Sequence, residues 1–222
     1  MRVRRVVDLS LAIDADTQIY PGDPAVLLTP HSTIVADGFN LLGVEMGSQS
    51  GTNVDAPYHF LAEGAPIDEV DLRLFTGTGV IIDVRGKAPR ALIDAVDVAP
   101  YLDGIGPGTI VVFHTGWPVY YRTPVFFDHP YLSTDACQLL LDRGVRTFCF
   151  DVLNVDETPD ESHPGDGFPC HRMIAAQGGV VVENLTALEQ IDFHEPFISV
   201  LPLRLTGADG APTRAVAIEF VA

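Results

Sequence analysis

Four side chains that can ionise or form strong hydrogen bonds stand close together in the first third of the chain: Gln49, Asn53, Asp55 and His59. They follow an apolar run, and Gly and Pro residues between them favour an irregular backbone on which the side chains can converge. A carboxylate and an imidazole at this spacing can bind a metal ion or act as an acid/base pair. A capped turn with a hydrogen-bonded histidine has the same spacing, so both interpretations stay open at this point.

Two further candidates, His171 and Glu183, stand much later in the chain. His171 opens a segment that favours a short helix, and Glu183 directly follows an apolar run of three valines. A carboxylate at the end of a buried strand is costly unless it is paired or bound to a metal, so its position favours a functional role. Helix capping or a structural ion pair is the alternative.

The elements that would position these residues are mostly strands. Short runs rich in Val, Ile and Phe, bounded by Gly, Pro or Asp, predict strands over 6–11, 41–46, 79–84, 109–114, 147–152, 180–182, 198–203 and 215–220. Helical spacing predicts helices over 134–144, with Ser133 or Thr134 as the cap, over 171–177, and over 88–98. The turn residues of 207–212 predict a β-hairpin. Together these patterns predict an α/β fold with a mixed, strand-rich sheet.

The composition predicts a globular and strongly acidic protein. Of the 222 residues, 47% are hydrophobic and 19% are charged, which is far from the composition of disordered chains. No low-complexity linker divides the sequence, so we expect residues 1–222 to form a single domain. With 13 Lys and Arg against 30 Asp and Glu, the formal net charge is −17, which argues against nucleic acids and anionic membranes as partners.

The cysteines and the N-terminus favour a cytoplasmic protein that acts on a small molecule. Cys137, Cys149 and Cys170 have neither metal-binding spacing nor the even count of a disulfide framework. Asp8 precedes any long apolar run, so the start of the chain lacks the core of a signal peptide. No run approaches the ~20 apolar residues that cross a bilayer.

The motifs along the chain resemble those of the cyclase family, which includes bacterial kynurenine formamidase and isatin hydrolase. The family signature His-x-Gly-Thr-His-x-Asp-x-Pro-x-His corresponds here to Gln49-Ser-Gly-Thr-Asn-Val-Asp-Ala-Pro-Tyr-His59. Other matching segments are spread along nearly the whole chain: 20–24, 114–117, 150–158, His171, 183–185 and 201–218. The resemblance implies a swivelling β/β/α fold, a homodimer or homotetramer, and divalent metal that activates water. We expect Tyr20 and Trp117, which lie in matching segments, to bind substrate.

The resemblance also implies which residues carry the reaction. In the family, the first two signature histidines and the aspartate bind one metal ion, and the same aspartate binds a second ion with a later histidine and a glutamate. Asp55, His171 and Glu183 keep the second set. His59 keeps the last signature histidine, which is expected to transfer protons with Asp55 or Glu183 beside it.

Gln49 and Asn53 stand where the resemblance places two metal-binding histidines. Amide oxygens are weak neutral ligands for zinc, so the first ion should lose much of its affinity. The expected cofactor is therefore one weakly bound divalent ion, zinc or manganese, or none. Both amides keep a donor and an acceptor, which suits them to hold a substrate instead.

Three functions follow from this set of residues. A natural-product cyclase acting on a polyketide-like compound is favoured, because ring closure needs positioning and proton transfer more than an activated hydroxide. A metal-dependent amide or lactone hydrolase of the kynurenine formamidase type is the alternative, supported by the survival of Asp55, His171 and Glu183. A non-catalytic ligand-binding or assembly protein is the third, and it is disfavoured because such a protein has no need for so many titratable groups.

Overall fold

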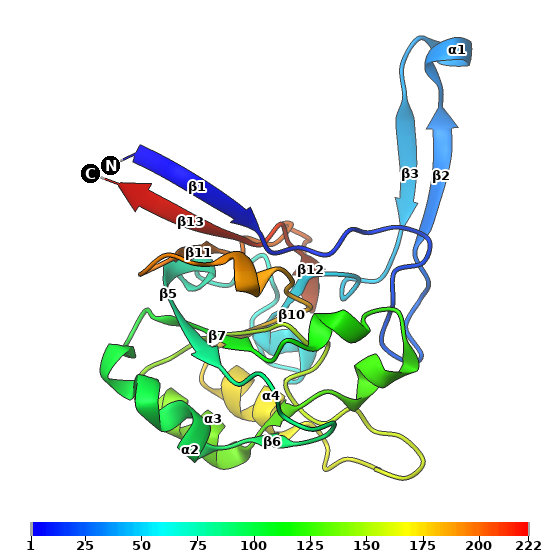
Figure 1. Ribbon diagram of the computed structural model, residues 1–222. Coiled ribbons are helices and arrows are strands. Elements are labelled where there is room, and N and C mark those ends of the chain that lie inside the picture. The colour runs from blue at the N-terminus through cyan, green and yellow to red at the C-terminus, as the bar shows by residue number, and fades with distance from the viewer. Residues whose placement is uncertain (1, 222) are drawn as a thin grey trace.

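A nine-stranded mixed sheet forms the centre of the computed structural model, which describes residues 2–221 (Figure 1). The strand order is β1 (Arg2–Asp8), β13 (Val216–Val221), β11 (Phe197–Ser199), β5 (Thr76–Asp83), β7 (Ile110–His114), β9 (Thr147–Phe150), β10 (Val180–Glu183), β4 (Asn53–Asp55) and β12 (Gly210–Pro212). The central strands β5, β7, β9 and β10 are parallel, and the flanking strands pair antiparallel. The predicted α/β fold with a mixed, strand-rich sheet is confirmed, and every predicted strand overlaps an observed one.

The central strands β7 and β10 carry the apolar runs 110–113 and 180–182 because both faces of the sheet are covered. Along β7, Val111 and Phe113 point to one core, whereas Ile110 and Val112 point to the other. The two cores therefore lie on opposite faces of the sheet, as the two-residue period of a strand requires. The same alternation determines to which face of the sheet a side chain at the end of a strand points.

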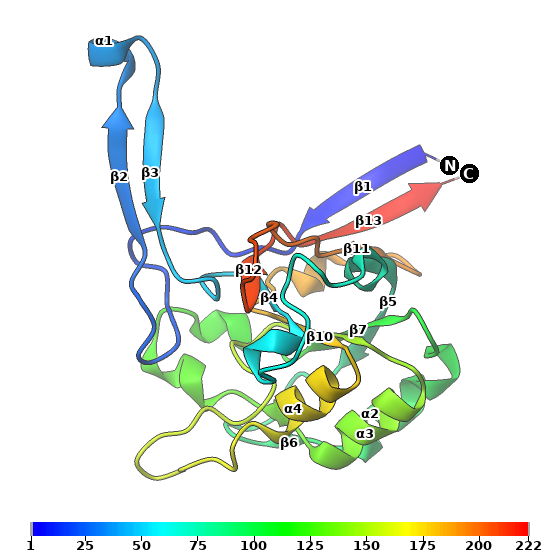
Figure 2. The same ribbon diagram turned by 180° about the vertical axis from the view of Figure 1, so that it is seen from behind.

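Three helices cover one face of the sheet: α2 (Ala95–Val98), α3 (Thr134–Asp142) and α4 (Pro169–Ala176) (Figures 1 and 2). The predicted cap of α3 is confirmed, since Ser133 Oγ accepts a hydrogen bond from the backbone of Ala136. Short 3-10 helices cover Pro57–His59, Leu72–Phe75, Ala99–Gly104, Trp117–Tyr120, Pro124–Asp128 and Leu188–Gln190. Among residues 2–221, none of the helices combines the length and the apolar surface needed to span a membrane.

One local prediction is wrong, and a second misses a strand partner. The predicted helix over 88–98 is helical only from Ala95, because Asp94 caps it there. Before it lies the strand β6 (Leu92–Ile93), which pairs with β8 (Tyr131–Leu132) in a two-stranded sheet. The predicted hairpin turn over 207–212 is confirmed, since Pro202 pairs antiparallel with Thr213 and the backbone N–H of Leu203 donates to the backbone oxygen of Pro212 at 3.1 Å. Its second half is β12, which pairs with β4 far back in the chain. Local turn chemistry does not specify such a distant partner.

A two-stranded arm projects from the rest of the molecule (Figure 1). It consists of β2 (Leu27–Ser32), the short helix α1 (Ile34–Asp37) and β3 (Leu41–Glu45), and β2 was not predicted. Its exposed apolar side chains are Leu27, Ile34, Val35, Phe39, Leu41, Leu42 and Val44. A lone two-stranded hairpin is marginally stable in water, so this surface is suited to contact another surface.

Candidate active site

Strand pairing brings three of the predicted site residues onto one face of the sheet. In the antiparallel register of β10 with β4, Glu183 lies opposite Asn53, and Val182 lies opposite Val54. Residues opposite each other share a face, and so do residues two apart, so Asn53, Asp55 and Glu183 all point to the side that α4 covers. Val54 and Val182 point into the other core.

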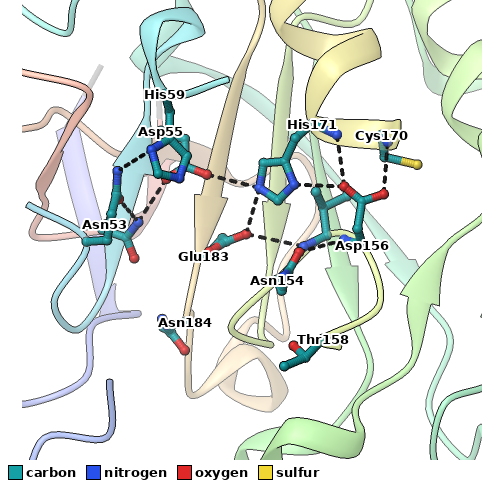
Figure 3. Close-up of polar contacts among 12 residues, drawn as sticks. Asn53, Asp55, His59, Asn154, Asp156, Thr158, Cys170, His171, Glu183 and Asn184 are labelled. Atoms are coloured by element: carbon teal, nitrogen blue, oxygen red, sulfur yellow. Dashed lines mark hydrogen bonds and ion pairs between the residues drawn. The ribbon is translucent and has the colours of Figure 1, made fainter. Parts of the chain in front are cut away.

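Helix α4 places His171 against these carboxylates (Figure 3). His171 Nε2 is 3.2 Å from Asp55 Oδ2 and 3.3 Å from Glu183 Oε1. All three side chains are buried. Burial lowers the pKa of His171, but its contacts with Asp156, Asp55 and Glu183 outweigh burial and hold that pKa well above the usual value. Burial, together with the neighbouring charge of Asp55, raises the pKa of Glu183.

Asp156 fixes both the start of α4 and the orientation of the imidazole. Its carboxylate accepts hydrogen bonds from the backbone N–H groups of Cys170 at 2.8 Å and His171 at 3.0 Å, which have no partner inside the helix. The same carboxylate accepts from His171 Nδ1 at 2.8 Å. Nδ1 therefore carries a proton, and Nε2 faces Asp55 and Glu183.

A single divalent ion fits Asp55, His171 and Glu183. One donor atom from each residue lies within 4.8 Å of the other two. Neighbouring ligands of an ion at metal–ligand distances of about 2.0–2.2 Å lie roughly 3.0–3.5 Å apart, and the two His171 Nε2 distances agree with this spacing. Two carboxylates and one imidazole are a donor set that zinc and manganese accept.

Gln49 and Asn53 do not form a matching site for a second ion. Asn53 Nδ2 donates to Gln49 Oε1 at 2.5 Å and to Asp55 Oδ1 at 3.1 Å. The two amides thus bond to each other, and Asn53 also bonds to Asp55, so their polar atoms do not face a common point where an ion could bind. Within residues 2–221, Asn53 Oδ1 is the buried side-chain atom without a hydrogen-bond partner.

His59 forms a second acid/base unit with Asp209. His59 Nδ1 lies 2.9 Å from Asp209 Oδ2, and that carboxylate also accepts from Ser48 Oγ at 2.7 Å and Gln49 Nε2 at 2.9 Å. An ionised carboxylate only accepts, so Nδ1 carries the proton and Nε2 keeps its lone pair. No group among residues 2–221 bonds to Nε2, which leaves it available to a substrate or water.

The contact between His59 and Asp209 shifts the pKa of both side chains. Burial lowers the pKa of His59, but the hydrogen bond to Asp209 and the negative charge of Asp55 outweigh it and raise that pKa overall. The hydrogen bond from His59 holds the pKa of Asp209 well below its usual range. Asp209 therefore stays ionised and stabilises the imidazolium form of His59.

A cavity of about 390 Å³ joins the two units. Six of the predicted site residues line it: Tyr20, Gln49, Asp55, His59, His171 and Glu183. Asn53 lies buried behind Gln49 and Asp55 and does not line the cavity. Trp117 also lies elsewhere, in the core under the helices, where its Nε1 donates to the backbone oxygen of Phe126 at 3.2 Å. The structure therefore gives Asn53 and Trp117 no direct contact with the cavity.

Three aspartates of the site, Asp23, Asp156 and Asp209, lie outside the predicted set of site residues. Asp209 stands in a segment for which turn residues predict only a hairpin, and its partner His59 is 150 positions away. The signal that was available is that all three lie in segments matching the cyclase family. Spacing along the sequence could not show which distant side chain each one meets.

Replacing Asp209 by Asn should shift the pH dependence of kcat/KM. Without the carboxylate the pKa of His59 falls, so the neutral imidazole that accepts a proton persists to lower pH. We expect the acid limb of the profile to move to lower pH and the rate to fall less than on removal of His59 itself. A profile measured from pH 5 to 9 tests this, and an unmoved acid limb would assign that limb to another group.

Comparison with known proteins identifies the family. A family model named Cyclase, with the description "Putative cyclase", matches residues 7–157. The kynurenine formamidase of Delftia acidovorans (strain DSM 14801 / SPH-1) is 30% identical over 216 residues, which cover 96% of this chain and 97% of that protein. The kynurenine formamidase of Geobacillus thermodenitrificans (strain NG80-2) is 26% identical over 210 residues, covering 94% and 95%. The chain belongs to the Cyclase family and is an enzyme.

Solved structures share the fold. An isatin hydrolase bound to the product analogue thioisatinate has a TM-score of 0.86 at 21% identity, over 96% of this chain and 92% of that one. Isatin hydrolase A from Ralstonia solanacearum has a TM-score of 0.85 at 22% identity, over 97% and 92%. A structure described as a potential metal-dependent hydrolase with cyclase activity has a TM-score of 0.78 at 24% identity, over 98% and 99%.

Proposed function

We propose that this enzyme is a metal-assisted hydrolase that cleaves an amide or lactone bond in a small aromatic substrate. One observation carries the proposal: a single cavity holds both the Asp55–His171–Glu183 set and a fixed imidazole, His59, with a free nitrogen. A site for a Lewis acid beside a positioned acid/base is what amide hydrolysis needs near neutral pH. The name kynurenine formamidase, borne by relatives along nearly the whole chain, supports the same reaction class.

Different residues of this chain bind the metal ion and transfer the proton. Asp55, His171 and Glu183 would hold one divalent ion, which when bound supplies Lewis acidity to a carbonyl oxygen and to water. His59 Nε2 takes a proton from the attacking water and returns it to the leaving nitrogen or oxygen as the bond to the carbonyl carbon breaks. Asp209 stabilises the imidazolium form of His59 that exists between these two proton transfers.

Tyr20 is placed to orient the substrate. Its ring lines the cavity, and burial, with the nearby charge of Glu183, raises the pKa of its hydroxyl to about 12. The hydroxyl therefore stays protonated at neutral pH and can donate a hydrogen bond to a carbonyl oxygen. Phe60 and Phe168, with ring centroids 5.4 Å apart, form an apolar wall suited to a flat aromatic ring.

The ring-forming reaction becomes the second candidate function. It is favoured by the bond between Asn53 and Gln49, which occupies the amides that replace two metal-binding histidines of the family signature. A natural-product cyclase could use His59 and Asp209 for proton transfer without an activated hydroxide. Membership of a family of enzymes argues against the non-catalytic alternative.

A direct assay tests the hydrolase proposal. We expect the purified enzyme to release formate from formanilide, a neutral aryl formamide, and to contain at most one divalent ion per chain by elemental analysis. Removal of the ion with EDTA should abolish formate release, and added zinc or manganese should restore it. If formanilide binds but no formate appears with either ion present, ring closure becomes the better proposal.

We also propose that the arm joins two copies of this chain. Residues 27–45 carry only Asp37 and Glu45 as charges in a chain of net charge −17, so an arm can approach another copy with little repulsion. The arm begins and ends beside the cavity, because Pro24 on one side and Gly47 on the other line it. Assembly through the arm would therefore also stiffen the cavity wall.

Charged substitutions on the arm should separate the copies. We expect light scattering to give a dimer or tetramer for the unmodified chain and a monomer for the Leu42→Asp, Val44→Asp double variant, because each aspartate puts charge into an apolar contact. The matched control, Leu72→Asp with Val96→Asp, alters exposed apolar residues outside the arm and should keep the oligomer. A monomeric unmodified chain at micromolar concentration would refute the assembly.

A further inference from the structure

The cavity wall carries an unbalanced set of charges. Four carboxylates line it: Asp23, Asp55, Glu183 and Asp209. None of the described residues that line the cavity is a Lys or an Arg. Its two imidazoles, His59 and His171, are each bonded to carboxylates through at least one ring nitrogen.

Three of the four carboxylates are already engaged. Asp55 and Glu183 contact His171. Asp209 accepts from His59, Ser48 and Gln49. Asp23 differs, since no hydrogen bond to its carboxylate forms among residues 2–221, although the side chain is half-buried in the wall. Asp23 is therefore the carboxylate that is free to receive a group of the substrate.

Two arginines that contact cavity-lining residues do not direct their guanidinium groups to Asp23. Arg122, whose backbone bonds to the cavity residue Gln18, directs its guanidinium to both oxygens of Asp14 at 2.6 Å. Arg172 donates to the backbone oxygen of Gly167 and lies over the Phe60 ring rather than in the cavity. The arm contains neither Lys nor Arg, so the arm of a second copy would bring no cation either.

We infer that the cavity accepts neutral or cationic substrates and rejects those that carry a carboxylate, and that Asp23 receives an ammonium or N–H group of the substrate. The amide part of this substrate class rests on the proposed hydrolase function, whereas the charge preference does not. A divalent ion would balance Asp55 and Glu183 and leave the charge of Asp23 unchanged. A carboxylate that entered would lose water and meet no Lys or Arg among the described residues that line the cavity, so electrostatics selects against it.

Binding of matched amines measures this preference without any turnover. Aniline, 3-aminobenzoate and 3-(aminomethyl)aniline share one ring and differ in net charge at pH 7.5. By calorimetry with the ion-loaded enzyme, we expect 3-(aminomethyl)aniline to bind at least about tenfold more tightly than 3-aminobenzoate, with aniline between them. The difference should shrink at high salt, because part of the cavity is open to solvent. Equal or tighter binding of 3-aminobenzoate would overturn the inference.

A substitution at Asp23 shows whether that residue sets the preference. Asp23→Asn keeps the shape and removes the charge, and we expect it to reduce the ratio between the cationic and anionic ligands at least about fivefold. Asp103→Asn makes the same change of net charge on an exposed residue outside the cavity and should leave the ratio unchanged. An unchanged ratio in Asp23→Asn would refute the role of Asp23.

The corresponding formamides separate this inference from the proposed function. Formanilide, 3-formamidobenzoate and N-[3-(aminomethyl)phenyl]formamide should be hydrolysed in the same order as their amines bind. If none is hydrolysed but the amines keep their order, the hydrolase proposal fails and the charge preference stands. If 3-formamidobenzoate is hydrolysed as fast as the cationic compound, the hydrolase stands and the charge preference is wrong.

Discussion

Replacing His59 by Ala is expected to lower turnover by about 10²- to 10⁴-fold, the usual effect of losing a positioned general acid/base. His59 lines the cavity, its Nδ1 is fixed by Asp209 at 2.9 Å, and its Nε2 is free. Its ring centroid lies 6.3 Å from that of His171, so it can act on a substrate held at the metal-binding set. Steady-state kinetics on formanilide measures the loss.

The fold should tolerate this substitution. The His59 and Asp209 side chains are 29% and 34% exposed, so the pair adds little to stability and its loss leaves no deeply buried charge. We expect an unchanged oligomer and metal content. His163→Ala is the matched control, because His163 also contacts an aspartate, Asp160 at 3.1 Å, but lies on an exposed loop outside the cavity. Near-full activity of His59→Ala would mean that another residue, Glu183 or His171, transfers the proton.

Replacing His171 by Ala is expected to cost about 3–5 kcal/mol of stability, as does breaking other buried ion pairs. The imidazole lies between Asp55, Glu183 and Asp156, all buried, and without it these carboxylates face one another with no cation. For a chain of this size the loss corresponds to about 6–20 °C in Tm. The variant should also lose the divalent ion and the activity. Calorimetric melting and elemental analysis provide the measurements.

Chemical rescue distinguishes the lost charge from the lost volume. Imidazole added to the His171→Ala protein can refill the space and accept a proton, so it should raise Tm. Pyrrole has a similar size but no basic nitrogen and should not. Equal effects of both compounds, or a Tm within 2 °C of the unmodified protein, would mean that the carboxylates do not depend on the imidazole for stability.

Local patterns in the sequence were sufficient for much of the scaffold. The runs that become β7, β9 and β10 are largely apolar because they are covered on both faces, and this is visible without any partner. The cap at Ser133 and the apolar spacing of α3 are equally local. The strand β2 was missed because Pro30 and polar residues interrupt its pattern.

The candidate site was predictable only in part. The isolated carboxylate of Glu183 after three valines, and the motif around Asp55 and His59, are signals in the sequence itself. Asp209 and Asp23 carried no comparable signal, because turns rich in Gly, Pro and Asp are common on protein surfaces. Trp117 lay in a matching segment, yet the structure buries it in the core, where its indole N–H has a backbone partner.

The sequence by itself determined the kinds of groups present: two carboxylates and an imidazole that we propose hold a metal ion, a second imidazole that we propose transfers protons, two amides, and a strand-rich α/β fold. Tertiary structure decided how these groups are paired. The register of β10 with β4, the cap of α4 by Asp156 and the return of the chain at β12 bring together side chains that are far apart in sequence. Hydrogen bonds and charges act over a few ångströms, so the pairing of His59 with Asp209 and the freedom of Asp23 follow only from the folded chain.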